Sequence, residues 1–288
     1  MTDLDCKPNI NIVCGATASG KSSMALEIAE KNNGVIINAD SIQLYKDLRT
    51  LTARPSADEE RAIPHALYGV LDADKKTSMG SWVLQAKKEI DTAHEQGKTP
   101  IIVGGTGLYI KTLINGITHI PPVSDETRKK VSEIYNEIGK DEFKKRVAEV
   151  DKELTDKFSD KQRLIRAMEV YTETAKPLSE WQKVPPEKFY DALQFEIHNA
   201  QINRVELYKR CDARFLAMIE QGAIDEVKAF KEKMSGSFEN YPITKALGFK
   251  ELSAHLDGDI TLDEAMSQAQ QSTRRYAKRQ ATWFRNQM

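Results

Sequence analysis

Residues 10–22 read Ile10-Asn-Ile-Val-Cys14-Gly15-Ala-Thr-Ala-Ser-Gly20-Lys21-Ser22. The first five residues are mostly apolar and predict a buried strand, and the residues after Gly20 keep a helical pattern up to residues 33–34. Between them the motif G-x-x-x-x-G-K-[ST] is matched at every fixed position. Such a loop turns main-chain N–H groups toward phosphate oxygens, and the helix start adds a partial positive charge. The segment therefore predicts a phosphate or pyrophosphate site.

The eight residues of the motif are our candidates for binding this diphosphate. Lys21 supplies a positive charge, and Ser22 supplies a hydroxyl oxygen for Mg²⁺, which is the cofactor that the motif indicates. The candidates are Gly15, Ala16, Thr17, Ala18, Ser19, Gly20, Lys21 and Ser22.

On the C-terminal side of this motif, short apolar strands alternate with helical patterns. We expect strands at residues 35–38, 100–103 and 194–197, and helices at residues 81–96, 108–114, 202–221, 225–233 and 261–285. This alternation predicts an α/β fold with a P-loop NTPase-like parallel sheet flanked by helices.

From residue 121 to residue 188 the strand signals disappear, and apolar residues recur at helical intervals. Proline pairs at residues 121–122 and 185–186 mark the two ends of this block. We therefore expect an inserted all-helical subdomain at residues 121–188. Residues 1–120 and 189–288 are expected to form the catalytic core with a helical C-terminal part.

The composition limits the class of protein. The 288 residues carry a net charge of −1, so any binding of nucleic acid must come from local patches. No apolar run reaches the roughly 18 residues that a membrane span needs, and charged residues near the N-terminus argue against a signal peptide. We therefore expect a cytoplasmic protein without membrane contact. Cys6, Cys14 and Cys211 show no C-x-x-C spacing and are expected to be inert thiols.

Two polar residues follow predicted strands. Asp40 comes after residues 35–38, and Thr106 lies in the glycine-rich segment after residues 100–103. The carboxyl ends of parallel strands meet at one edge of a sheet, so both residues should lie near the phosphate loop. Asp40 is then a general base, a metal-related residue or an Asx cap of local backbone. The segment at residues 104–107 is either a second backbone cradle or an ordinary tight turn.

The C-terminal stretch concentrates positive charge. Arginine and lysine alternate with Tyr276, Trp283 and Phe284, and no acidic residue intervenes after Thr273. Such a mixture suits a surface for phosphates and bases, and it equally fits an amphipathic helix whose aromatic residues pack inward. The candidate basic residues are Arg274, Arg275, Lys278 and Arg279.

Several blocks of the chain closely resemble the bacterial tRNA dimethylallyltransferases. They follow in that family's order and cover nearly the whole chain. They are Gly15 to Ser22, Asp40-Ser-Ile-Gln43, Val103-Gly-Gly-Thr-Gly-Leu-Tyr109, Gln162-Arg-Leu-Ile-Arg166, Arg210-Cys-Asp-Ala-Arg214, Leu247-Gly-Phe-Lys-Glu251 and Thr273-Arg-Arg-Tyr-Ala-Lys-Arg-Gln280.

The resemblance implies an enzyme that transfers a dimethylallyl group from dimethylallyl diphosphate to N6 of the adenosine 3′-adjacent to the anticodon of tRNA, releasing pyrophosphate. It implies Asp40 as the base, with Lys21, Thr106 and Arg214 as the other catalytic residues. It further implies tRNA contacts on the anticodon stem-loop. The residues that would make them are Asp40, Ser41, Ile42, Gln43, Thr106, Arg128, Gln162, Arg163, Leu164, Ile165 and Arg166, with the four C-terminal basic residues above.

Three alternatives remain beside this reading: prenyl transfer to a free adenine nucleotide, a P-loop small-molecule kinase, and a non-catalytic RNA-binding module. The helical insertion and the basic C-terminus favour a macromolecular acceptor. Leu51 and Ala175 stand where the family usually has glycine, which bears on local loop shape. Without a heptad pattern or a large apolar stripe, we expect a monomer.

Overall fold

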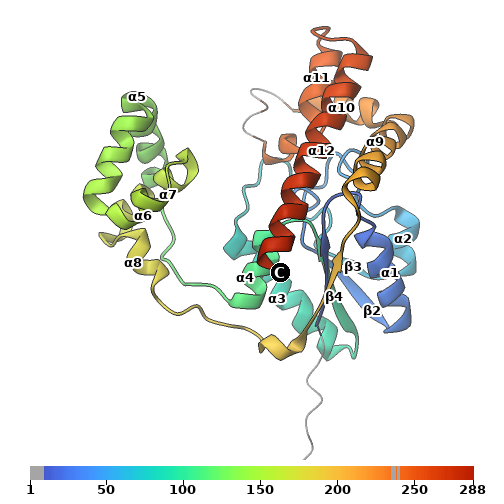
Figure 1. The fold of residues 1–288 in the computed structure, drawn as a ribbon, viewed down its shortest axis with the longest axis horizontal. Helices are drawn as coiled ribbons and strands as arrows, with labels where there is room; N and C mark the ends of the chain where they lie inside the picture. The colour runs from blue at the N-terminus through green and yellow to red at the C-terminus, as the bar shows by residue number, and fades with distance from the viewer. Residues whose placement is uncertain (1–9, 235–237, 239–240) are drawn as a thin grey trace, which may run out of the picture. The chain divides into compact units, whose positions relative to one another are not determined.

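A computed structural model describes residues 10–234, 238 and 241–288 (Figure 1). The chain forms two compact units. The first, which we call the core unit, combines Met1–Ile114 with Phe189–Met288, and the second, the helical unit, is Asn115–Lys188. Cys6 and the charged residues near the N-terminus lie outside the described residues.

The core unit is built on a sheet of five parallel strands in the order β3-β2-β4-β1-β5. The strands are β1 (Ile10–Gly15), β2 (Gly34–Asn38), β3 (His65–Ala66), β4 (Thr99–Gly104) and β5 (Phe195–Ala200). Strand β1 lies between β4 and β5, and Val13 pairs in register with Val103. Nearly every residue of β1, β2 and β4 is buried, as expected for a parallel sheet covered on both faces. The predicted α/β class is confirmed.

In the described part of the chain, the N-terminal half of the core unit contains four helices. They are α1 (Lys21–Lys31), α2 (Ala57–Ala62), α3 (Met79–Glu95) and α4 (Gly107–Asn115). Helix α1 packs Ala25 and Ala29 against Val13 and Ile36 of the sheet. Helix α3 buries Trp82, whose indole N–H donates to the carbonyl of Asn38 at 2.8 Å.

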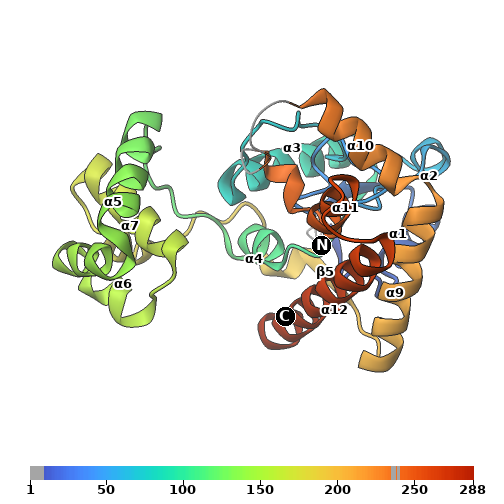
Figure 2. The same ribbon diagram turned by 90° about the horizontal axis from the view of Figure 1, so that it is seen from above.

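The C-terminal part of the core unit is helical. It contains the short 3₁₀ turns η1 (Ala192–Gln194) and η3 (Pro242–Lys245), with α9 (Arg204–Glu220), α10 (Ala223–Lys233), α11 (Phe249–Leu256) and α12 (Leu262–Gln287). Helix α12 packs against α9, α11 and β1, and Figure 2 shows it running beside α9. A cluster that includes Phe215, Val227, Phe230 and Phe249 forms the core between these helices.

The helical unit has its own apolar core. Its helices are α5 (Asp125–Val150), α6 (Lys152–Lys157), α7 (Lys161–Thr174) and α8 (Leu178–Gln182). Phe143, Val147, Leu164 and Val170 are fully buried together. Gly139 interrupts α5 with φ 74° and ψ 173°, a conformation that glycine adopts at little cost.

The predicted helices and the strands at residues 10–14, 35–38, 100–103 and 194–197 are confirmed, with ends that differ by a few residues. Helices α2 and α11 and strand β3 were not predicted. Strand β3 has only two residues, and α2 has no buried residue, so neither carries a hydrophobic period. No helix within the described part of the chain is long and apolar enough to cross a membrane.

Candidate active site

The phosphate loop joins β1 to α1 through an unusual backbone. Gly15 has φ 151°, Ala18 has φ 61° and Gly20 has φ 93°. A Cβ atom on Gly15 would lie 2.9 Å from the carbonyl oxygen of Ala200, so the close approach of β5 also requires glycine there. The chain then enters α1 at Lys21, and the first N–H groups of that helix have no partner within it. The loop thus has the geometry of an anion cradle.

Lys21 and Ser22 are the first two residues of α1. The Lys21 ammonium donates to the carbonyl of Ala16 at 3.3 Å. Burial and the nearby positive charge of Arg214 lower the pKa of Lys21, the negative charge of Asp40 opposes them, and the net pKa is about 8. A lysine with this pKa has a charge that an anion would stabilise. Ser22 is exposed, and its hydroxyl is available to a metal ion or phosphate.

Arg214 reaches the loop from α9. Its Nη1 atom donates to the hydroxyl of Thr17 at 3.2 Å. Burial lowers the pKa of Arg214, while the charge of Asp40 raises it. Because the guanidinium stays protonated even so, the loop has two cations beside it, Lys21 and Arg214.

Asp40 follows β2 and lies near Thr106, as predicted. The N–H of Asp40 donates to the side-chain oxygen of Asn38 at 2.8 Å, and its Oδ1 accepts from the N–H of Ile42 at 3.0 Å. The N–H of Ser41 donates to the hydroxyl of Thr106 at 3.1 Å. One carboxylate oxygen therefore forms the Asx-type turn. The other oxygen, Oδ2, has no hydrogen-bond partner among the described residues.

The glycine-rich segment after β4 explains why these strand ends come together. A Cβ atom on Gly104 would lie 2.1 Å from the carbonyl oxygen of Ala39. Its absence lets the two strands approach, and the N–H of Thr106 donates to that same oxygen at 3.1 Å. The segment is thus a tight turn that fixes Thr106 beside Asp40.

Gln280 of α12 is a site residue that sequence reasoning missed. Its Oε1 accepts from the N–H of Thr17 at 2.8 Å, and its Nε2 donates to the carbonyl of Gly105 at 2.9 Å. We expected the N–H of Thr17 to bind the diphosphate, but Gln280 already occupies that donor. Only the hydroxyl of Thr17 remains on the cavity side.

A cavity of about 360 Å³ opens between these elements. One end has Thr17, Asp40 and Arg214, and the wall is largely apolar. Tyr276 also lines it, and burial followed by the charge of Asp40 raises the pKa of this phenol to about 12, so the hydroxyl remains protonated. The apolar wall is made by Ile42, Leu51, Phe215, Met218, Ala246 and Leu247.

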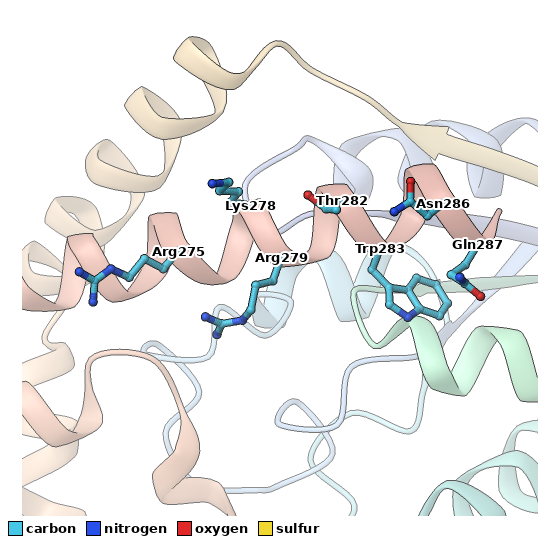
Figure 3. A pocket seen from close by; sticks show the side chains of 7 residues that line it. All are labelled: Arg275, Lys278, Arg279, Thr282, Trp283, Asn286 and Gln287. Carbon is cyan, nitrogen blue, oxygen red and sulfur yellow. The ribbon is translucent and has the colours of Figure 1, made fainter. Parts of the chain in front are cut away.

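A second cavity of about 550 Å³ follows the exposed side of α12. Figure 3 shows Arg275, Arg279 and Trp283 projecting to one side of the helix at intervals of four residues, with Lys278 on the neighbouring row. Among the described residues no carboxylate forms an ion pair with Arg275, Lys278 or Arg279. Arg279 also lines the first cavity, so the two cavities share a residue.

Arg274 faces elsewhere. It is half-buried, and its Nη1 lies 2.5 Å from a carboxylate oxygen of Asp212 on α9. Gln270 donates to the carbonyl of the same aspartate at 3.2 Å. Arg274 therefore connects α12 to α9, unlike Arg275, Lys278 and Arg279.

Most of the predicted tRNA-binding residues of the helical unit lie on its surface. Gln162 and Arg163 are exposed, and Arg128 is exposed beside Asp125. Arg166 is half-buried and pairs with Glu169 at 3.5 Å. The expectation for Leu164 is wrong, because its side chain has no exposed surface and packs in the core of the unit. The half-buried Ile165 packs against the same core.

The residues Asp40 to Gln43 were also expected to bind tRNA. Ser41 and Ile42 line the first cavity together with Asp40. Gln43 turns away, and its Nε2 donates at 2.8 Å to the carbonyls of both Thr52 and Ala53. Gln43 thus holds the loop that carries Leu51 into the cavity wall.

Comparison with known proteins identifies the family. The family model described as IPP transferase matches residues 43–287. The chain belongs to this family. Among relatives, a tRNA dimethylallyltransferase from Caulobacter sp. (strain K31) is 43% identical, with 96% of this chain and 90% of the relative covered. One from Wolbachia pipientis wMel is also 43% identical, with 98% and 93% covered.

Solved structures of IPP transferases share the fold. A eukaryotic dimethylallyltransferase acting on tRNA matches with a TM-score of 0.83 at 28% identity, over 96% of this chain and 69% of the other. A tRNA isopentenylpyrophosphate transferase from Staphylococcus epidermidis matches with a TM-score of 0.67 at 32% identity, over 98% and 91%. The likeness to this family of transferases therefore extends over nearly the whole chain.

Proposed function

We propose that this chain transfers a dimethylallyl group from dimethylallyl diphosphate to N6 of the adenosine 3′-adjacent to the anticodon of tRNA, releasing pyrophosphate. One observation carries the proposal. A single cavity brings together Thr17 of the phosphate loop, the guanidinium of Arg214, the Asp40 carboxylate with a free oxygen, and an apolar wall. These are the parts needed to bind a prenyl diphosphate and to take a proton from an amine.

The diphosphate binds to the phosphate loop. Main-chain N–H groups of residues 18 and 20–22 and the charges of Lys21 and Arg214 surround the position of its oxygens, while the N–H of Ser19 donates to the carbonyl of Ala16. When the allylic carbon–oxygen bond breaks, negative charge grows on the departing pyrophosphate. Groups fixed in advance around that charge stabilise the transition state more than the bound substrate.

The residues present also fit Mg²⁺. Ser22 offers an exposed hydroxyl oxygen at the start of α1, and Mg²⁺ prefers oxygen ligands from a protein side chain, phosphates and water. No group of His, Cys, Asp or Glu suitable for a metal occurs in the described part of the chain, so the protein would contribute few ligands. When bound, Mg²⁺ neutralises part of the diphosphate charge.

Asp40 acts as the general base. As the bond from N6 to the allylic carbon forms, the amine nitrogen becomes acidic, and the free Oδ2 of Asp40 accepts its proton before releasing it to water. The bond between Oδ1 and the N–H of Ile42 keeps this carboxylate oriented. Thr106 orients Asp40 through the N–H of Ser41.

The apolar wall binds the dimethylallyl group. Leu51, Phe215, Met218 and Leu247 contribute side chains that exclude water from the electrophilic carbon. Water that reached this carbon would hydrolyse the donor. Leu51 is buried and lines this wall together with Phe215.

The tRNA contacts follow from the position of the charges. Arg275, Lys278 and Arg279 border the cavity along α12 and suit phosphate oxygens of the RNA strand that carries the adenosine. Ser41, Ile42 and Thr106 contact the adenosine, and Arg128, Gln162, Arg163 and Arg166 contact the anticodon stem. The site lies within one chain, and we propose that the enzyme acts as a monomer in the cytoplasm, where its tRNA substrate occurs.

A comparison of acceptors tests this function. The purified chain, Mg²⁺ and radiolabelled dimethylallyl diphosphate are incubated with unmodified tRNA or with AMP, at equal concentrations. We expect label in tRNA and little in AMP, with one pyrophosphate released for each group transferred. Faster labelling of AMP would contradict the tRNA acceptor. Labelling of neither acceptor would contradict the reaction itself.

A further inference from the structure

Gln280 forms hydrogen bonds to two loops, the phosphate loop at Thr17 and the loop at Gly105. It lies on the buried side of α12 with only 6% of its surface exposed, although glutamine is usually a surface residue. Both ends of its carboxamide bond to main chain rather than to side chains. A buried amide that is satisfied at both ends by two different loops fixes the distance between them.

The first of these loops binds the diphosphate. The Oε1 atom of Gln280 accepts from the N–H of Thr17 at 2.8 Å, while the hydroxyl of Thr17 accepts from Arg214 at 3.2 Å. Thr17 is thus held from the α12 side by Gln280 and from the cavity side by Arg214. Ala277 of α12 packs against Ala16, which further ties this helix to the loop.

The second loop orients the base. The Nε2 atom of Gln280 donates to the carbonyl of Gly105 at 2.9 Å, and the next residue is Thr106. The hydroxyl of Thr106 accepts from the N–H of Ser41, which directly follows Asp40. Hydrogen bonds and two peptide units therefore run from Gln280 to the carboxylate.

Gly105 leaves room for the carboxamide of Gln280. A Cβ atom at residue 105 would lie 2.2 Å from Nε2 of Gln280, whereas its distance to the carbonyl oxygen of Gly15 would be an ordinary 3.5 Å. Gly105 is not among the residues with positive φ, so its backbone could accept alanine. The glycine is therefore needed for the close approach of Gln280.

We propose that Gln280 is a positioning residue that holds the phosphate loop and the Asp40 side of the cavity at one separation during prenyl transfer. The proposal rests on the proposed function. The amide suits this role because it donates to one loop and accepts from the other without adding a negative charge beside the diphosphate. It also takes the N–H of Thr17 out of phosphate binding, which leaves the donors nearer the helix start to bind the diphosphate.

A double-mutant cycle tests the proposal by kinetics. The variants are Gln280→Ala, Gly105→Ala and the two together, with Gln271→Ala, an exposed glutamine of the same helix, as the control. We expect each single variant to lower kcat about 10- to 100-fold, with little change in KM for tRNA, because a misplacement near 1 Å costs about that much. The double variant should be no slower than the slower single variant, and the control should match the wild type.

The proposal is overturned if Gln280→Ala keeps the wild-type kcat, if the two losses multiply, or if only KM for tRNA changes. Inorganic pyrophosphate affinity is measured on the same variants and should fall for Gln280→Ala but not for Gln271→Ala. A pyrophosphate affinity equal to that of the wild type in Gln280→Ala contradicts the coupling to the phosphate loop.

Amide hydrogen exchange in the wild-type protein decides the case if Gln280→Ala does not fold or if the chain transfers no prenyl group. We expect the N–H of Thr17 to be protected before pyrophosphate is added and unchanged afterwards, while the N–H groups of Lys21 and Ser22 gain protection. A Thr17 amide that exchanges freely until pyrophosphate is added would overturn the proposal. Absence of prenyl transfer with a protected Thr17 amide would instead contradict the proposed function alone.

Discussion

Arg214 donates a hydrogen bond of 3.2 Å to the hydroxyl of Thr17, which joins helix α9 to the phosphate loop. The guanidinium therefore adds a second positive charge beside the phosphate loop, near Lys21. Arg214→Ala should weaken pyrophosphate binding and lower kcat by about 10²-fold or more, because it removes a charge that stabilises the leaving group. Titration calorimetry and single-turnover kinetics measure the two effects. Arg204→Ala, on the exposed start of the same helix, should change neither.

Two substitutions of Asp40 distinguish its role as a general base from its role in the local Asx turn. Asp40→Ala removes both the base and the Asx turn, whereas Asp40→Asn keeps an oxygen for the N–H of Ile42. Both variants should lose about 10²- to 10⁴-fold in turnover, with pyrophosphate affinity largely kept. If Asp40→Asn retains most of the wild-type rate in single-turnover assays, Asp40 only shapes the loop.

The pKa of Lys21 predicts how binding depends on pH. Burial lowers this pKa from its ordinary value to about 8, so the ammonium is charged below pH 8 and increasingly neutral above it. A diphosphate prefers the charged form, so affinity for pyrophosphate should be full below pH 8 and fall as the pH rises through this value. Calorimetry from pH 7 to pH 9.5 measures this. Lys21→Met should bind weakly throughout, and an identical fall in that variant would assign the pH dependence to the ligand.

The charges of α12 separate into two groups. Arg275, Lys278 and Arg279 have no ion pair in the described part of the chain, whereas Arg274 pairs with Asp212. Each of the three variants to alanine should weaken tRNA binding and reduce the salt slope of log K by roughly 0.7–0.9. Arg274→Ala should lower thermal stability while leaving that slope unchanged. A slope that drops as much in Arg274→Ala would contradict this separation.

Ala175 ends helix α7 in the left-handed conformation, with φ 54°. This conformation costs alanine about 1–2 kcal/mol, and glycine avoids it at an entropy cost of roughly 0.4–1 kcal/mol. Ala175→Gly should therefore stabilise the protein by about 0.5–1 kcal/mol in denaturant unfolding. Gly139→Ala, with φ 74° in the same unit, should destabilise it. Destabilisation by Ala175→Gly would show that the alanine side chain has a packing role.

Much of the core unit could be predicted because residues close together in the sequence specify its strands, loops and helices. The apolar strand before Gly15 and the motif that ends at Ser22 specify strand, loop and helix within thirteen residues. Asp40 and Thr106 could be brought together because parallel strands end at one edge of the sheet. Arg274 could not be separated from its neighbours, because its partner Asp212 lies 62 residues away in the sequence.

Gln280 was not singled out as a site residue from the sequence, because a lone glutamine among arginines suggests a solvated surface. A signal was nevertheless present. Ala269, Thr273, Ala277, Gln280 and Phe284 recur at intervals of three or four residues and form the buried side of α12. A polar residue on such a stripe must find partners inside the protein.

The most direct measurement is mass analysis of tRNA after incubation with the purified chain, Mg²⁺ and dimethylallyl diphosphate. Nuclease fragments should contain one dimethylallyl group on the adenosine that follows the anticodon, and the Asp40→Asn protein should produce almost none. A prenyl group at another nucleotide, or unmodified tRNA with an active donor present, would contradict the account.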